Sequence, residues 1–288
     1  MNRMLTVILA LALAALACGP NLPNIQVPVE RITPGPTETL TIDEAAPDGD
    51  TVMDVTLGIG AGNITLAGGA EGLVSGTVRY NIPDWKPEIT READSLIIRQ
   101  DFSPDDRLRI PEGNLTNEWD LKLGAAPMRL TVNAGAYEGQ MDLGGVPLQR
   151  LEINDGASDN TVTFDEVNTE AMTLFKYNTG ASTVKLEGLS NANFAEMIFE
   201  GGAGTYTLDF SGELQREARV SVRAGICTLT LIVPAGVKAE VTRSGAVTTV
   251  KTEGTWSTSG DTYSTGGSGP LLTIDVDMGL GTLNLISK

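Results

Sequence analysis

The acids are the residues of this sequence with the most evident capacity for chemistry, and two pairs of them are closely spaced. Asp275 and Asp277 are separated by one residue and so point to one face of an extended strand. Asp155 and Asp159 lie around a glycine-alanine corner. Calcium takes six to eight oxygen ligands, so paired carboxylates of this kind could hold it. We favour the simpler interpretation, in which both pairs are solvated acids on the outer faces of strands.

The chain contains no histidine, which removes the commonest general base and metal ligand of proteins. Ser-His-Asp and Cys-His mechanisms are therefore excluded, as are histidine-ligated zinc sites. Enzymes that cleave polysaccharides on a β-helix use clustered acids, often with basic residues and calcium, whereas the acids here are scattered. We expect no enzyme, no catalytic residue, no cofactor and no metal. The alternative is a polysaccharide-active β-helix enzyme or a calcium-dependent glycan binder.

Two glycine clusters look like ligand loops but lack the residues that would complete them. The run Gly201–Gly204 is similar to the calcium-binding nonapeptide of secreted β-rolls, which needs an aspartate where Tyr206 stands. The alternation of Gly58, Gly60 and Gly62 leads into an apolar strand pattern with no lysine behind it, unlike a phosphate-binding loop. Neither cluster is predicted to bind a ligand.

Cys18 is the residue with the clearest expected modification. Residues 1–17 contain Arg3 and an apolar run over 5–17, too short to span a bilayer and typical of a signal peptide. The run ends in ALACG, which resembles a bacterial lipobox, although alanine stands where leucine is usual three places before the cysteine. We expect acyl chains on Cys18, and hence a membrane anchor. An ordinary cleavage site after residue 17 is the alternative.

The second cysteine, Cys227, falls in phase with the apolar residues that follow it. We therefore expect a buried small side chain rather than a nucleophile. If Cys18 is acylated, the chain holds no partner for a disulfide.

Two aromatic residues lie in a segment, 253–270, that is rich in glycine, serine and threonine. Trp256 and Tyr263 there suggest a binding loop for a sugar or polymer, and they are our candidate ligand-binding residues. A mobile hairpin without a ligand is the simpler interpretation.

These residues must be positioned by a repeated element of 21 to 24 residues. Each unit has an alternating apolar run, a corner of glycine plus a small or apolar residue, and a second alternating run. The corners are Gly135-Ala136, Gly156-Ala157, Gly180-Ala181, Gly202-Ala203 and Gly225-Ile226. The same sequence pattern recurs around Gly60-Ala61, around Gly245-Ala246 and, near the C-terminus, around Gly279-Leu280-Gly281. We expect glycine at the corners because it reaches positive φ without penalty.

A fixed period of this length, with apolar residues at every second position, predicts stacked strands. We therefore predict an all-β, β-helix-like solenoid of the single-stranded type, with about eight layers. An antiparallel β-sandwich is the alternative, because it also has many short strands. Residues 103–119 are expected to form a long loop, and the last strand is expected to cap the stack or offer an edge to a partner.

The formal net charge is −17, and this limits the kinds of partner that the chain can bind. An excess of acidic residues argues against binding nucleic acid, whose phosphates attract lysine and arginine, and against electrostatic adsorption to anionic lipid. Aromatic residues make up only 5%, while glycine contributes 33 residues, which suits thin layers of small aliphatic side chains.

The sequence from Leu57 to Leu66, LGIGAGNITL, carries a family resemblance when it is read with Tyr80 and the run WKPE at 85–88. Together they resemble the N-terminal toastrack domain of bacterial envelope proteins, over roughly residues 38–125. The repeats behind them are similar to those of adhesin-type and cell-wall-antibiotic-response proteins. The resemblance implies a β-stack at the cell surface and carries no catalytic residues.

We therefore predict four segments: a signal peptide over 1–17, a lipidated cysteine and proline-rich tether over 18–37, an N-terminal toastrack-like domain over 38–120, and a solenoid repeat domain over 121–288. The predicted function is that of a lipid-anchored, extracytoplasmic lipoprotein that binds without catalysis, in adhesion, scaffolding or envelope-stress sensing. Its expected partners are the membrane, through the anchor, and an envelope protein or glycan.

Overall fold

A computed structural model describes residues 29–49, 51–100, 108–111 and 113–288, and its regular structure is almost entirely β. The predicted signal peptide, Cys18 and most of the predicted tether lie outside these residues. Within the described ranges, no helix is long and apolar enough to cross a bilayer. The short elements are β1 (Val29–Ile32), β2 (Glu38–Glu44), β4 (Val74–Tyr80), η1 (Pro83–Trp85), β5 (Glu88–Arg91), β6 (Ser95–Arg99), β7 (Leu108–Pro111), β8 (Asn117–Leu123), η2 (Leu189–Ala192), β15 (Ser257–Ser259) and β16 (Thr262–Ser264).

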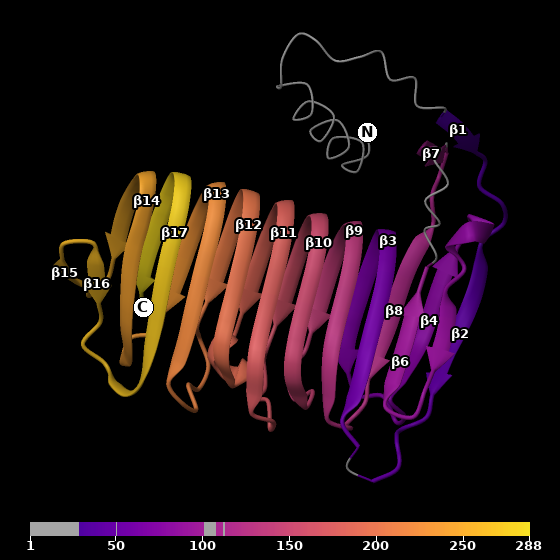
Figure 1. The fold of residues 1–288 in the computed structure, drawn as a ribbon, viewed down its shortest axis with the longest axis horizontal. Coiled ribbons are helices and arrows are strands. Elements are labelled where there is room, and N and C mark those ends of the chain that lie inside the picture. The colour runs from indigo at the N-terminus through magenta and orange to yellow at the C-terminus, as the bar shows by residue number, and fades with distance from the viewer. Residues whose placement is uncertain (1–28, 50, 101–107, 112) are drawn as a thin grey trace.

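The body of the protein is a stack of long parallel strands, one to a layer (Figure 1). In spatial order they are β3 (Met53–Gly68), β9 (Met128–Asp142), β10 (Leu148–Thr163), β11 (Met172–Glu187), β12 (Phe194–Asp209), β13 (Ala218–Val233), β17 (Ser268–Ser287) and β14 (Val237–Glu253). Each strand pairs in parallel register with its neighbours, as a solenoid requires. The predicted all-β solenoid is confirmed, and the antiparallel sandwich is wrong.

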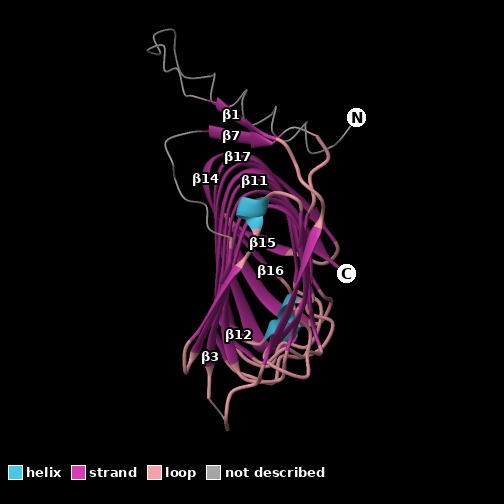
Figure 2. Cartoon of the chain, turned by 90° about the vertical axis from the view of Figure 1, so that its right-hand side faces the viewer, coloured by secondary structure: helices cyan, strands magenta, loops and turns pink. Residues whose placement is uncertain are grey.

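Each long strand bends at its corner, so that the sheet folds over into two walls with the core between them (Figures 1 and 2). We call the residues before the corners the first wall and those after them the second wall. In β13, side chains 218, 220, 222 and 224 are buried, Gly225 and Ile226 are exposed, and 227, 229, 231 and 233 are buried. The two exposed corner residues shift the alternation by one, which lets both halves of one strand face the same core.

The corner glycines form a column through the stack, and close approach rather than positive φ explains it. None of Gly135, Gly156, Gly180, Gly202 and Gly225 has positive φ. A Cβ on Gly180 would lie 2.4 Å from the carbonyl oxygen of Gly156, and one on Gly202 would lie 2.4 Å from that of Gly180. The expectation of positive φ is therefore wrong for this column. Positive φ occurs at other corner positions: Gly245 in β14 has φ of 113° and stands one place before the column, and Gly62 in β3 and Gly281 in β17 have φ of 152° and 149° two places after it.

The N-terminal end of the stack divides into two branches. Strand β6 continues the first wall from β3 and pairs with β5, whereas β8, β4 and β2 continue the second wall. The predicted loop over 103–119 is wrong in part, because β7 and the start of β8 lie within it; residues 101–107 and 112 are outside the described ranges. The predicted domain boundary after residue 120 lies inside β8, in a sheet that runs on through β3 into β9.

Two buried amides close this end of the glycine column. Gln100 Oε1 accepts from the backbone N–H of Gly60 at 3.3 Å, and Asn117 Nδ2 donates to the carbonyl oxygen of Ala61 at 2.6 Å. Gln100 Nε2 also donates to Asn117 Oδ1 at 2.8 Å. The side chains thus supply hydrogen bonds that a further layer would otherwise provide.

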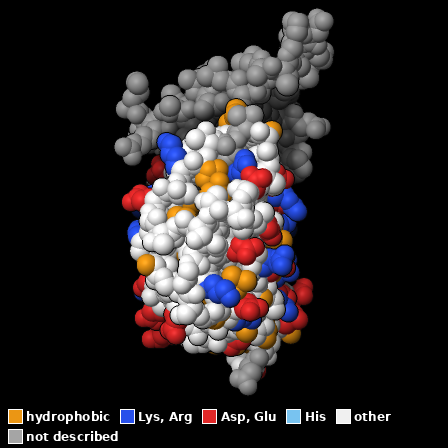
Figure 3. Space-filling model, turned by 90° about the vertical axis from the view of Figure 1, so that its left-hand side faces the viewer, with side chains coloured by type: hydrophobic (Ala, Val, Ile, Leu, Met, Phe, Trp, Pro, Cys, Tyr) orange, Lys and Arg blue, Asp and Glu red, His pale blue; other side chains and the backbone are white. Residues whose placement is uncertain are grey.

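At the other end, the C-terminal strand β17 lies between β13 and β14 and is not the final layer. The expectation that it caps the stack is wrong. Its inward side chains, including Leu272, Ile274 and Leu283, are fully buried, whereas β14 places Arg243 and Thr252 in the same phase. A strand with apolar inward side chains is stabilised most when both of its edges are paired, whereas a more polar strand is better suited to the edge of the sheet. The hairpin of β15 and β16 covers part of β14, and Figure 3 shows charged side chains mainly around the rim of this end surface.

Candidate functional site

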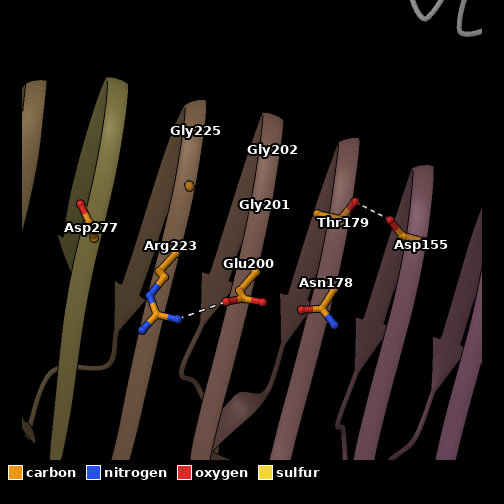
Figure 4. Close-up of a pocket in the computed structure, with 10 residues that line it drawn as sticks. Asp155, Asn178, Thr179, Glu200, Gly201, Gly202, Arg223, Gly225 and Asp277 are labelled. Carbon is orange, nitrogen blue, oxygen red and sulfur yellow. Dashed lines mark hydrogen bonds and ion pairs between the residues drawn. The ribbon is translucent and has the colours of Figure 1, made fainter.

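An open trough of about 560 Å³ lies on the first wall just before the corners of the middle layers. Figure 4 shows its lining on β10, β11, β12, β13 and β17, with Asp155 at one end and Asp277 at the other. Its floor is formed by Gly201, Gly202, Ala224 and Gly225. None of these residues projects a long side chain outward, so the backbone is exposed between the polar side chains of the rim.

A row of polar side chains, brought together by the parallel register, runs along the first wall and forms the rim of the trough at one end. Each stands two residues before its corner glycine: Asn133 and Asn154 lie outside the trough, and Asn178, Glu200, Arg223 and Asp277 form its rim. Asn154 Nδ2 donates to Asn133 Oδ1 at 3.0 Å, and Asn178 Nδ2 donates to Asn154 Oδ1 at 2.5 Å. Arg223 pairs with Glu200 at 3.1 Å. In-register stacking therefore aligns six separate residues in one row, in which the three asparagines are linked by hydrogen bonds and Glu200 and Arg223 form a pair.

Asp155 occupies the next position, one residue before its corner, where the phase directs a side chain inward. Its Oδ2 accepts from the hydroxyls of Tyr177 at 2.8 Å, Ser158 at 3.0 Å and Tyr137 at 3.2 Å. Its Oδ1 accepts from the hydroxyls of Thr179 and Ser182. We call these six residues the Asp155 hydroxyl cluster. A carboxylate has about four lone-pair sites, so the protein itself fills them.

The interpretation of Asp155 and Asp159 as a pair of solvated acids is therefore wrong for Asp155. Asp159 is exposed on the outer face of the second wall, while Asp155 turns toward the interior. The shift of phase at Gly156-Ala157 sends the two carboxylates to opposite faces. Asp275 and Asp277 do share the outer face of the first wall, and Asp275 lies 3.7 Å from Arg219. Among the described residues, no cluster of three or more acids or cysteines is placed to hold a metal ion.

Tyrosine phenols beneath the trough are held protonated. Burial, together with the Tyr177 and Asp155 groups beside it, raises the pKa of Tyr137 well above its usual range. Burial and the charge of Asp155 raise the pKa of Tyr177 in the same way. Tyr177 stacks on Phe199 with ring centroids 5.6 Å apart, and Phe199 meets Tyr206 edge-on at 4.9 Å. Both cluster phenols therefore remain hydrogen-bond donors to Asp155 at physiological pH.

Two tyrosines in adjacent layers should respond oppositely to loss of the hydroxyl. Tyr177→Phe removes the bond to Asp155 and the 2.8 Å bond from Asn160 Nδ2, and we expect a loss of about 2 kcal/mol of unfolding free energy. The Tyr206 hydroxyl is buried without a hydrogen-bond partner among the described residues, so Tyr206→Phe should gain up to about 1 kcal/mol. Equilibrium unfolding in urea measures both changes. Equal losses in the two variants would contradict this assignment.

Cys227 is buried, as its phase predicts, and 5% of its surface is exposed. Burial raises the pKa of its thiol to about 11. A thiol that ionises more easily unfolded than folded stabilises the fold fully below its unfolded pKa, about 8.5, and this contribution is lost as pH rises toward the folded value.

We therefore expect the urea midpoint of the protein to fall between pH 8.5 and 10, with a loss of about 1 to 2 kcal/mol at the upper pH. The Cys227→Ala variant, measured over the same pH range, serves as the control. It should lose most of this pH dependence, and an equal fall in the variant would show that other groups cause it.

The candidate aromatic residues lie apart from the trough, at the C-terminal end of the stack. Trp256 and Tyr263 are partly buried against the core, and the indole N–H of Trp256 donates to the Glu253 carbonyl oxygen at 3.1 Å. Tyr263 belongs to β16, which pairs with β14 and β15, so segment 253–270 contains the expected hairpin. Binding of a ligand by these two aromatics stays a prediction, as does lipidation of Cys18, which lies outside the described residues.

Sequence reasoning missed the rim residues Asn178, Glu200 and Arg223. A signal was present, since each stands two places before a corner glycine. Stacking corners in register would have aligned all three, but their surroundings depend on which layers are neighbours.

Comparison with known proteins agrees with this architecture at the N-terminal side. Residues 33–175 match the family described as the N-terminal domain of toast_rack, DUF2154. No curated protein gives a significant match.

Several solved structures are similar over most of the chain. One, described as a "putative cell adhesion protein" from Clostridium sporogenes, has 20% identity and a TM-score of 0.48, covering 88% of this chain and 99% of its own. A "putative adhesin" from Parabacteroides merdae has 11% identity and a TM-score of 0.41, covering 89% and 99%. Another from Bacteroides fragilis has 10% identity and a TM-score of 0.39, covering 88% and 99%. Residues 33–175 thus form a toast_rack-type N-terminal domain, and its parallel strands continue without a break into the rest of the stack.

Proposed function

We propose that this protein is a non-catalytic binding module of the bacterial cell envelope, displayed outside the cytoplasm by a lipid on Cys18. In this role it serves adhesion, scaffolding or the sensing of envelope stress. The observation that carries the proposal is the trough on the first wall, an outward-facing row of polar side chains held in register by the stack. A rigid parallel sheet presents such a row with little loss of conformational entropy on binding.

The hydrogen bonding of Asp155 supports binding rather than catalysis. A general acid or base must be within reach of a substrate proton and free to exchange it. Asp155 lines the trough, but its oxygens already accept from five hydroxyls of the protein. In this proposal, Asp155 holds the corner in place and the side chains of the rim contact the ligand.

The proposal about binding is tested with the full chain in its own membrane. The protein is crosslinked in intact cells, and captured molecules are identified by mass spectrometry against a strain that lacks the gene. A specific inner-membrane protein as partner supports sensing, and capture of surface proteins or cell-wall glycan supports adhesion or scaffolding. Capture of nothing beyond the control would contradict the proposed binding role. Turnover of glycans by the purified protein, with or without calcium, would establish the enzyme alternative instead.

The anchor has its own test. The wild-type chain should fractionate with membranes and carry acyl groups on Cys18 by mass spectrometry, because two or more acyl chains hold a protein stably in a bilayer. Cys18→Ser should be found in the soluble extracytoplasmic fraction, and Cys227→Ser should behave as wild type. An unmodified Cys18 in wild-type protein would refute the anchor.

A further inference from the structure

We propose that the trough binds an extended, uncharged polysaccharide segment laid across strands β11, β12, β13 and β17. This inference rests on the proposed binding function and names its ligand class. It follows from which hydrogen-bonding groups of the trough are already used and which are free.

The free groups stand at the two ends of a short row. Asn178 Oδ1 is buried and has no donor within the described part of the chain, although Asn178 Nδ2 is bonded to Asn154. Asp277 is exposed on β17 and has no ion-pair partner in the residues that the structure describes. Between them, Glu200 and Arg223 pair with each other at 3.1 Å. Arg223 has five N–H donors, so most remain available to a ligand.

The spacing of this row requires an extended ligand. Asn178, Glu200, Arg223 and Asp277 are direct neighbours on four successive strands. Strands in a sheet lie about 4.8 Å apart, so the row spans about 14 Å. A single sugar cannot meet both ends, whereas several linked rings running along the stack can. The groups presented in order are an acceptor, an ion pair with spare donors, and an acceptor.

Sugar hydroxyls match this order because each can donate one hydrogen bond and accept others. They can donate to Asp277 while accepting from Arg223, and they can donate to Asn178 Oδ1 once that amide turns toward the trough. The floor of Gly201, Gly202, Ala224 and Gly225 projects no long side chain, so a ring can lie close to the backbone. Asp155, whose oxygens are filled by its own cluster, does not compete for the ligand.

A cationic peptide fits the same row less well. The carboxylate of Glu200 is already paired, and a lysine placed between the free acceptors would lie beside the guanidinium of Arg223. Like charges at that separation repel, and the neutral amide of Asn178 offers no charge in return.

The test uses the full chain in detergent and isothermal titration calorimetry with four probes: cellohexaose, chitohexaose, mannohexaose and xylohexaose. We expect at least one to bind, and the corresponding disaccharide to bind at least tenfold more weakly. Asn178→Ala and Asp277→Ala should each weaken binding about fivefold or more, since each removes one hydrogen bond. Thermal unfolding of each variant confirms that it is folded.

Matched controls lie on the same wall. Asn133→Ala removes a member of the row that lies outside the trough, and Asp275→Ala removes an acid of the same strand that faces Arg219. Both should leave affinity within twofold of wild type. No binding of any hexasaccharide, equal losses in the control variants, or salt-sensitive binding of hexalysine in place of the sugars would each overturn the proposal.

Failure of the trough assignment can be distinguished from failure of the proposed binding function. If crosslinking captures an envelope partner equally with wild type and with the Asn178→Ala, Asp277→Ala double variant, the module binds by another surface. In that case the trough assignment falls and the binding function stands.

Discussion

Replacing Asp155 with alanine should destabilise the protein by about 3 to 5 kcal/mol, because it leaves several buried donors without an acceptor. The carboxylate accepts from Tyr137, Ser158, Tyr177, Thr179 and Ser182, which come from three successive layers. Hydrogen bonds to a charged group contribute about 1.5 to 3 kcal/mol each, and losses within one network are not additive. Loss of the carboxylate therefore removes the side-chain hydrogen bonds that link β9, β10 and β11 at the corner.

The comparison that isolates this effect is Asp159→Ala. Asp159 lies on the same strand and is exposed, so its removal should change the unfolding free energy by no more than about 0.5 kcal/mol. Asp155→Asn, which keeps the shape but places an amide donor among hydroxyl donors, should fall between the two. Urea unfolding followed by circular dichroism gives the three values. A cost for Asp155→Ala similar to that of Asp159→Ala would show that the cluster does not hold the layers together.

The second large effect is expected at the glycine column. Gly180→Ala places a Cβ 2.4 Å from the carbonyl oxygen of Gly156, and backbone cannot swing away as a flexible side chain can. Overpacking of this kind costs about 1 to 3 kcal/mol and sometimes more, and here it would also open the spacing between β10 and β11. We expect a loss of about 3 kcal/mol, measured by the shift of the urea midpoint at constant slope.

Gly266→Ala provides the matched control for this substitution. Gly266 has no atom within 4 Å of an added Cβ and has no positive φ, so the same chemical change meets open space. It should be neutral or slightly stabilising, because alanine reduces the freedom of the unfolded chain. If Gly180→Ala were equally well tolerated, the corners would need glycine for some reason other than contact between layers.

Both expectations show how far local sequence pattern predicts this structure. Alternation of apolar residues identified the inward faces, as the burial of Cys227, Leu229 and Leu231 confirms. The period of the corner glycines identified the layers. These features can be predicted from the sequence because each strand repeats the same local geometry. At the column position, the backbones of successive layers also approach too closely for any residue but glycine.

The Asp155 hydroxyl cluster could not be predicted in the same way. Asp155 and Asp159 seem to share a face only if the alternation runs on through the corner, but Gly156 and Ala157 shift its phase. Four of the five hydroxyl partners, Tyr137, Tyr177, Thr179 and Ser182, are contributed by other layers and lie 18 to 27 residues away in the chain. Their convergence depends on register between strands, which no single repeat contains.

Local patterns in the chain are thus enough to predict the class of fold, the repeat with its corner glycines and the resemblance of the N-terminal part to the toast_rack family. The order of the last layers, in which β17 enters between β13 and β14, becomes visible only in the folded protein. Two strands could take the inner place, and the strand whose inward side chains are more completely apolar gains more from having both edges paired. The order therefore depends on comparing strands that lie far apart in the chain. The trough has the same origin, since its rim exists only once four strands stand side by side in one register.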